Sequence, residues 1–243
     1  MPRSKRPKWN AEYKHHMNAS GEKEQEPVRF SMRTFLAMLV LLIVIFPFIE
    51  LMSYGVLVLS LLLTLVLLSA LPAIGSRRST LVWGIALAVP AVAGKWVNYF
   101  RPDLMPLEIF LVSAALFCGF VVMHLLRFVL AAARVSLDIL CAAIANYMML
   151  GLLWSFAYQL VAQIFPDSFS FVLGAAPRQV PTGFEAFYFS FATLMTVGYG
   201  DIIPASNVSR MLAITESVAG VFYVTILVAR LVAIYSAEGE KER

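Results

Sequence analysis

The chain has 243 residues and a formal net charge of +4; 60% of its residues are hydrophobic and only 14% are charged. A soluble domain usually contains about 45–50% apolar and about 25% charged residues. This composition excludes an ordinary soluble domain and indicates an integral membrane protein embedded in a lipid bilayer. The two cysteines, Cys118 and Cys141, lie inside apolar runs and are too few for a disulfide framework.

The N-terminal segment, residues 1–33, holds eight of the nineteen Lys and Arg residues. A basic cluster beside an apolar run is typical of a cytoplasmic tail, so we expect no nucleic-acid partner. No small-residue cleavage site follows the first apolar run, which we therefore expect to remain as an anchor. An unstructured polar tail is favoured here; a metal site at the adjacent His15 and His16 is the alternative.

Long apolar runs come next and predict membrane-spanning helices. A span needs roughly 20 apolar residues to cross a hydrocarbon core of about 30 Å. Residues 34–74 are apolar over about twice that length, so the chain must fold back near Pro47, Glu50 and the SYG sequence at 53–55. Residues 95–106 are expected to form an interfacial loop with Trp96 and Tyr99 at the headgroups. The expected spans are 34–52, 55–74, 81–98 and 107–130, which form a four-helix domain over 34–130, followed by 136–165 and 209–235.

One apolar segment is too short to cross. Residues 183–195 (GFEAFYFSFATLM) fit a short helix, which follows the proline-containing stretch 166–182 and precedes the glycine-rich sequence TVGYGD at 196–201. Non-helical backbone at membrane depth is tolerated only where protein or a water-filled cavity covers it. The segment therefore predicts a re-entrant helix and loop.

Six spans place both termini on one side of the membrane. The short loops do not decide which side, because four basic residues fall on each: Arg77, Arg78, Arg127 and Arg134 against Lys95, Arg101, Arg178 and Arg210. The basic N-terminal cluster decides, by the positive-inside rule. We expect both termini, including a short tail at 236–243, in the cytoplasm, and the protein in the plasma (inner) membrane.

The glycine-rich stretch has the chemistry of a cation site. Gly198 and Gly200 can adopt backbone conformations that are closed to residues with a Cβ atom, so successive carbonyls can point the same way and replace the water shell of a cation. The sequence TVGYGD resembles the selectivity filter of potassium channels, in which TVGYG is the established filter sequence. The choice of K⁺ follows from this resemblance and not from the geometry.

The resemblance implies a pore domain over 136–235, with an outer helix at 136–165, a pore helix at 183–195, a filter at 196–201 and an inner helix at 209–235. One chain supplies one filter strand, so the resemblance implies a homotetramer with cyclic symmetry. K⁺ is the permeant ion, and no other cofactor is expected. The implied residues are Thr196, Val197, Gly198 and Tyr199 as K⁺ ligands (with the Thr196 hydroxyl), Gly200 as the last filter residue, Asp201, Tyr188 and Phe189 as filter support, and Gly220 as the gating hinge.

Ionisable residues inside spans are functional candidates because burying them in lipid is costly. Glu216 lies one helical turn before Gly220, and we hypothesise that it packs behind the filter, near Ser190 or Thr193, and influences filter stability. An interfacial carboxylate that faces water is the alternative. For Arg230, snorkelling to the headgroups is favoured over lining the pore mouth.

Helical spacing from Val221 turns one face of the inner helix toward the axis. The residues expected to line the inner pore are Thr225, Val228 and Val232. Asp138, His124 and Glu50 are expected at helix ends or in the bundle interior, paired with loop arginines.

The fourth span contains few charges. Arg127 and Arg134 are its only basic residues besides His124, whereas steep voltage dependence needs about three to four charges per subunit. We therefore expect an all-α membrane protein that passes K⁺ passively and is not steeply voltage-gated. Gating by nucleotide or calcium would require a regulatory partner.

Three alternatives remain open: a voltage-gated cation channel, a mechanically gated one, and a potassium-transport or regulatory subunit. An enzyme is not expected, because the spans contain no Ser/His/Asp cluster, paired carboxylates or HExxH sequence.

Overall fold

The computed structural model describes residues 32–49, 51–74, 78–172, 181 and 183–241. Within these ranges, six helices are long and apolar enough to cross a membrane. They are the first helix (Met32–Ile49), α2 (Gly55–Ala73), α3 (Arg78–Phe100), α4 (Leu107–Ala131), α5 (Leu137–Ile164) and α7 (Asn207–Lys241). The protein is therefore an all-α integral membrane protein. His15, His16, Glu50, Arg77 and Arg178 lie outside the described residues.

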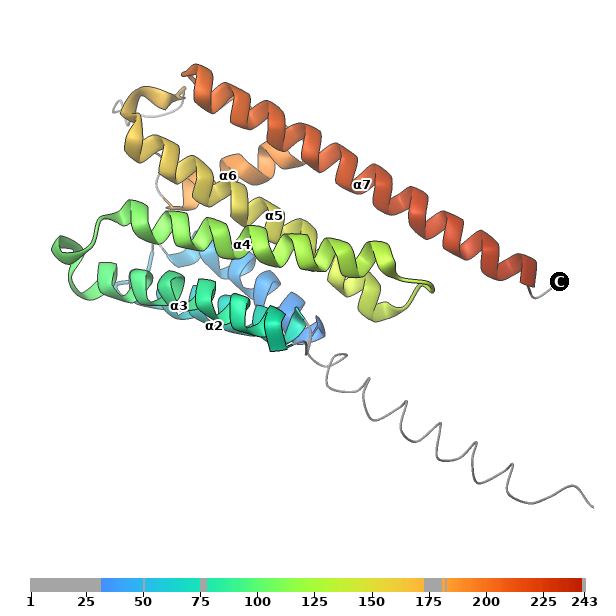
Figure 1. Ribbon diagram of the computed structural model, residues 1–243. Coiled ribbons are helices and arrows are strands. Elements are labelled where there is room, and N and C mark those ends of the chain that lie inside the picture. The colour runs from blue at the N-terminus through green and yellow to red at the C-terminus, as the bar shows by residue number, and fades with distance from the viewer. Residues whose placement is uncertain (1–31, 50, 75–77, 173–180, 182, 242–243) are drawn as a thin grey trace, which may run out of the picture.

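Shorter elements connect the long helices. They are η1 (Pro102–Leu104), η2 (Pro166–Ser168), β1 (Phe169–Phe171), α6 (Gly183–Leu194) and β2 (Ile202–Pro204). Strand β1 pairs with β2 in antiparallel register. The described ends of the chain lie on the same side of the bundle, opposite the β1–β2 pair (Figure 1).

The first helix and α2–α5 form one bundle around a common core in which Phe35, Val66, Phe117 and Met149 are fully buried. In lipid, helices associate through close packing of small residues and not through the hydrophobic effect. Helix α3 follows this rule, because its buried residues are Gly84, Ala88, Ala91 and Gly94. These small side chains let α3 approach its neighbours α2 and α4.

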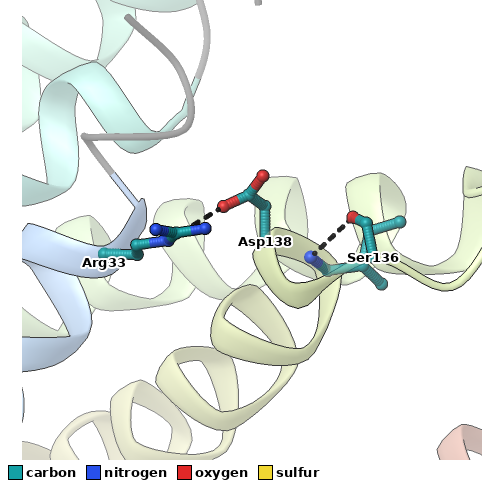
Figure 2. A network of polar contacts seen from close by, with 4 residues as sticks. Arg33, Ser136 and Asp138 are labelled. Atoms are coloured by element: carbon teal, nitrogen blue, oxygen red, sulfur yellow. Dashed lines mark hydrogen bonds and ion pairs between the residues drawn. The ribbon is translucent and has the colours of Figure 1, made fainter. Parts of the chain in front are cut away.

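The first helix contacts both α5 and α6 of its own chain. At one end, Arg33 Nε lies 3.4 Å from Asp138 Oδ1 near the start of α5, where the Ser136 hydroxyl caps the helix (Figure 2). At the other end, the Phe46 ring packs on Phe184 and Phe187 of α6, with centroid distances of 5.5 and 5.1 Å. The four-helix unit is thus attached to α5 and α6 of the same chain.

The structure adds detail to three sequence predictions. Asp138 forms an ion pair with Arg33 of the first helix. The predicted interfacial loop begins six residues later than Lys95, at Arg101, because α3 continues to Phe100. The Lys95 ammonium within α3 lies 5.5 Å from the centroid of the Phe110 ring. The predicted tail at 236–243 is largely helical, since α7 runs to Lys241.

Candidate functional site

Helix α6 does not cross the membrane. Its 12 residues correspond to about 18 Å at about 1.5 Å per residue, well short of a hydrocarbon core of about 30 Å. It packs against α5 and α7 and lies between them (Figure 1). The chain therefore turns back after Leu194, and the carbonyl end of α6 points at the segment 196–201.

The backbone of this segment alternates in handedness. Thr196, Gly198 and Gly200 have φ values of +56°, +56° and +78°. Such alternation turns successive N–H groups to one side of the chain and carbonyls to the other. The sequence predicts positive φ at the two glycines but not at Thr196, because a β-branched residue rarely adopts it.

The N–H groups at the start of this segment bind to the end of α6. Thr196 N donates to the Thr193 carbonyl at 2.9 Å, and the Ala192 carbonyl accepts from Val197 N at 2.8 Å and Gly198 N at 3.3 Å. In the described part of the chain, the carbonyls of residues 196–199 accept no hydrogen bond. Residues 195–200 are all exposed. The segment thus presents carbonyl oxygens with no partner in the described part of their own chain.

Two consecutive aromatic residues of α6 face different directions. The Tyr188 ring stacks on Tyr199, with a centroid distance of 6.0 Å and an interplanar angle of 8°. Partial burial, the hydrogen bond to the Asp201 carboxylate and the charge of that carboxylate raise the pKa of Tyr188 to about 12. Phe189 instead packs on Tyr158 and Phe169, away from Tyr199. Tyr188 therefore contacts Tyr199, whereas Phe189 packs on α5 and β1, and support of a filter by either residue stays a prediction.

The β1–β2 pair anchors the chain after Asp201. The Asp201 carbonyl accepts from Val172 N at 2.9 Å, and its carboxylate accepts from Ile202 N at 3.0 Å. The Ser209 hydroxyl, near the start of α7, donates to the Ser168 carbonyl at 2.7 Å. The sequence does not predict this anchor, since each strand has only three residues and their pairing depends on the fold.

The end of α6 also contacts α7 at Gly220. A Cβ atom on Gly220 would lie 2.4 Å from the Leu194 carbonyl oxygen. That carbonyl accepts from the Tyr147 hydroxyl at 3.2 Å, and the preceding one, of Thr193, accepts from Ser217 at 3.3 Å. Gly220, predicted as a hinge, therefore lies where α7 passes close to the end of α6, and a Cβ atom has no room there.

Glu216 is fully buried. Its carboxyl group contacts the Ser190 hydroxyl of α6 and the Tyr158 hydroxyl of α5. This is the position behind the filter that the sequence hypothesis gives it, beside Ser190. The alternative, an interfacial carboxylate that faces water, is wrong.

The far half of α7 is exposed along most of its length. Thr225 is exposed, and Val228 and Val232 are 52% and 57% exposed. The residues predicted to line the pore are therefore not buried by their own chain. Arg230 turns toward the α4–α5 loop, where its Nη2 donates to the Ala132 carbonyl at 3.1 Å. The contact places Arg230 beside the α4–α5 loop, and its snorkelling to the headgroups or lining of the pore mouth stays a prediction.

Part of the chain is similar to known ion channels. Residues 147–237 match the model of a family described as an ion channel. Two curated relatives are each 44% identical over 48 residues, which is 20% of this chain: two-pore potassium channel 4 of Arabidopsis thaliana and the voltage-gated potassium channel Kch of Escherichia coli (strain K12). No solved structure matches the chain significantly.

Over residues 147–237 the chain is therefore similar to ion channels, and a stretch of 48 residues is similar to two potassium channels. The alignments span only 17% of the Arabidopsis protein and 11% of the Escherichia coli protein. The family match covers residues 147–237, from within α5 to α7.

Proposed function

We propose that this protein is a potassium-selective channel in which four copies surround one axis and K⁺ passes between the carbonyls of residues 196–199. The observation that carries the proposal is the backbone of this segment. Its φ values are positive at every second residue, Thr196, Gly198 and Gly200, its first N–H groups bind to α6, and its carbonyls have no partner within the described chain. A ring of such carbonyls replaces the hydration shell of a dehydrated cation.

The electrostatics of α6 support the same role. The carbonyl end of a helix carries a partial negative charge, equivalent to about half an elementary charge. The end of α6 at Leu194 adjoins the segment 196–201, so this partial charge favours a cation on the axis. The exposed face of α7 below Gly220, with Thr225, Val228 and Val232, is then the wall of the inner pore.

Conduction in this proposal is passive and not steeply voltage-dependent. Within α4, Arg127 is the only Lys or Arg, and Arg134 follows the end of the helix at Ala131. Steep voltage dependence needs about three to four charges per subunit. The basic N-terminal segment favours an orientation with both termini in the cytoplasm.

The test is a bilayer recording from the purified protein with K⁺ on one side and Na⁺ on the other. We expect the current to reverse at a potential near that of K⁺ and the conductance to vary only weakly with voltage. The variant Gly198→Val should lose K⁺ selectivity, because valine at φ +56° is strained. A reversal potential near zero for the wild type would exclude potassium selectivity, and a steep conductance–voltage curve would restore the voltage-gated alternative.

A further inference from the structure

A buried carboxyl group joins the three helices of the pore segment. Glu216 of α7, Ser190 of α6 and Tyr158 of α5 are all 0% exposed. The Tyr158 hydroxyl lies 2.5 Å from Glu216 Oε2, and the Ser190 hydroxyl lies 2.6 Å from Glu216 Oε1. The same Ser190 oxygen lies 2.8 Å from the Gly151 carbonyl oxygen of α5. Three oxygen–oxygen contacts of hydrogen-bond length therefore form one chain behind α6.

Each of these contacts needs one hydrogen. A hydroxyl supplies one, whereas a carbonyl or an ionised carboxylate supplies none. With Glu216 ionised, only the Tyr158 and Ser190 hydroxyls carry a hydrogen, and the Ser190 hydrogen cannot lie in both of that residue's contacts. One pair of buried oxygens would then face each other with no hydrogen between them.

A proton on Glu216 Oε1 removes this conflict. Tyr158 then donates to Oε2, Glu216 donates to the Ser190 oxygen, and Ser190 donates to the Gly151 carbonyl. Every hydrogen has an acceptor, and the chain of donors runs in one direction across the three helices. A proton on Oε2 would not achieve this, because the Tyr158 hydrogen would lose its acceptor.

Burial favours the same assignment. An isolated ionised carboxylate is costly in a low-dielectric interior unless a cation is paired with it. Among the described residues, Glu216 takes part in no ion pair, and its hydrogen-bond partners are the neutral hydroxyls of Ser190 and Tyr158.

We propose that Glu216 carries a proton in the working channel and, as a hydrogen-bond donor, positions α6 between α5 and α7. The proposal rests on the proposed function, since it assigns a support to that filter. Glu216 is a positioning residue and does not touch the permeant ion. It acts through Ser190, which lies on the helix that ends at the filter.

The protonation state is tested without any current. Infrared spectra of the full chain in lipid at neutral pH should contain the C=O stretch of a protonated carboxyl group that is lost in Glu216→Gln and shifts in heavy water. The matched control Glu108→Gln removes a carboxyl group from the first turn of α4 and should leave that band in place. Loss of a carboxylate band in Glu216→Gln, in place of the protonated one, would overturn the proposal.

The positioning role is tested by conduction. In Glu216→Gln the new amide can donate to Ser190 and accept from Tyr158, so this variant should keep the wild-type K⁺ over Na⁺ permeability ratio. Glu216→Ala leaves the buried Tyr158 hydroxyl without its acceptor and leaves Ser190 with the Gly151 carbonyl as its remaining partner, and we expect the conducting fraction to fall about tenfold or more. A Glu216→Gln channel that fails like Glu216→Ala, or a Glu216→Ala channel that conducts like the wild type, would contradict the role. If the wild type itself shows no K⁺ selectivity, the proposed function fails while the spectra still decide the protonation state.

Discussion

The space for a side chain at Gly220 is limited by a backbone atom of α6. A Cβ atom there would lie 2.4 Å from the Leu194 carbonyl oxygen and 2.9 Å from Leu194 Cδ1. Since the oxygen belongs to the backbone of α6, an alanine at this position must displace α6. We expect Gly220→Ala to destabilise the channel by about 1–3 kcal/mol, the usual cost of overpacking, and to lower its Tm in detergent.

The matched control is Gly119→Ala in the middle of α4, where a Cβ atom would meet only Leu153 Cδ1 at 4.0 Å. This variant should leave the Tm close to that of the wild type. If Gly220 serves only as a hinge, Gly220→Ala would change gating and leave the Tm unchanged, contrary to the packing role.

Tyr188 of α6 contacts Tyr199 through its ring and Asp201 through its hydroxyl group. Tyr188→Phe keeps the ring stacked on Tyr199 but removes the hydrogen bond to Asp201. We expect the loss of this half-exposed hydrogen bond to destabilise the arrangement of residues 196–201 by about 1 kcal/mol. The K⁺ current of the variant should therefore decay faster than that of the wild type. Tyr99→Phe, in the aromatic cluster of α3, is the control and should decay like the wild type.

The pH dependence of this bond has a definite sign. The pKa of Tyr188 is raised from 10.0 to about 12, so the stabilisation is fully present below pH 10 and is lost as the pH rises through about 12. At neutral pH the current decay of the wild type should therefore show no titration of this group. A titration near neutral pH that disappears in Tyr188→Phe would contradict the assignment.

The residue types of the site are predictable from the sequence, but their directions are not. The presence of glycine at positions 198 and 200 is enough to predict the positive φ of Gly198 and Gly200. The same φ at Thr196 opposes the preference of a β-branched residue and arises from its hydrogen bond to Thr193 and from the chain reversal after α6. Phe189 differs from Tyr188 only by one helical position, which turns it by about 100° to the other face.

At the scale of elements, α7 is held at its far half by two polar side chains. The Tyr223 hydroxyl donates to the Ala143 carbonyl of α5 at 2.7 Å, and Arg230 donates to Ala132 in the α4–α5 loop at 3.1 Å. These contacts connect the inner helix directly to the junction between the four-helix unit and the pore segment. A movement of α4 would therefore reach α7 through this loop.

Removal of the Arg230 contact should loosen this part of α7. A hydrogen bond from a charged group is worth about 1.5–3 kcal/mol, so in Arg230→Gln we expect hydrogen exchange of α7 beyond Leu227 to speed up about tenfold. Arg127→Gln, at an exposed position of α4, is the matched control. Equal exchange in the two variants would show that the contact does not restrain α7.

The long helices follow from apolar runs, because length and hydropathy alone decide whether a segment can span a bilayer. The end of α3 cannot be predicted from hydropathy, because the mixed sequence KWVNYF suits an interfacial loop as well as a helix. The helix is favoured there by contacts made in the fold: Lys95 over Phe110 and the Trp96 N–H on the Thr64 hydroxyl at 3.1 Å.

At the scale of the whole molecule, α7 differs from the other spans. Only 6% of the apolar stretch of α7 is buried within the chain, compared with 50% of the apolar stretch of α5. The filter segment is exposed on the same chain, with Tyr199 71% exposed. Further copies of the chain would cover both the exposed face of α7 and the exposed backbone, and the ring of four proposed above would do so around one axis.

Subunit mixing counts the copies in one pore. Gly198→Val places a strained residue at φ +56° and should stop selective conduction whenever one such strand is present in the ring. When equal amounts of wild type and Gly198→Val are co-expressed and co-purified, a tetramer retains K⁺ current in only about one sixteenth of the pores, a dimer in about one quarter and a monomer in about one half. Mixtures with Gly119→Ala control for dilution and should keep the full current. We expect the fraction near one sixteenth, because only the four-fold ring brings each carbonyl level of residues 196–199 around a single ion; a fraction of one quarter or more would refute the proposed homotetramer.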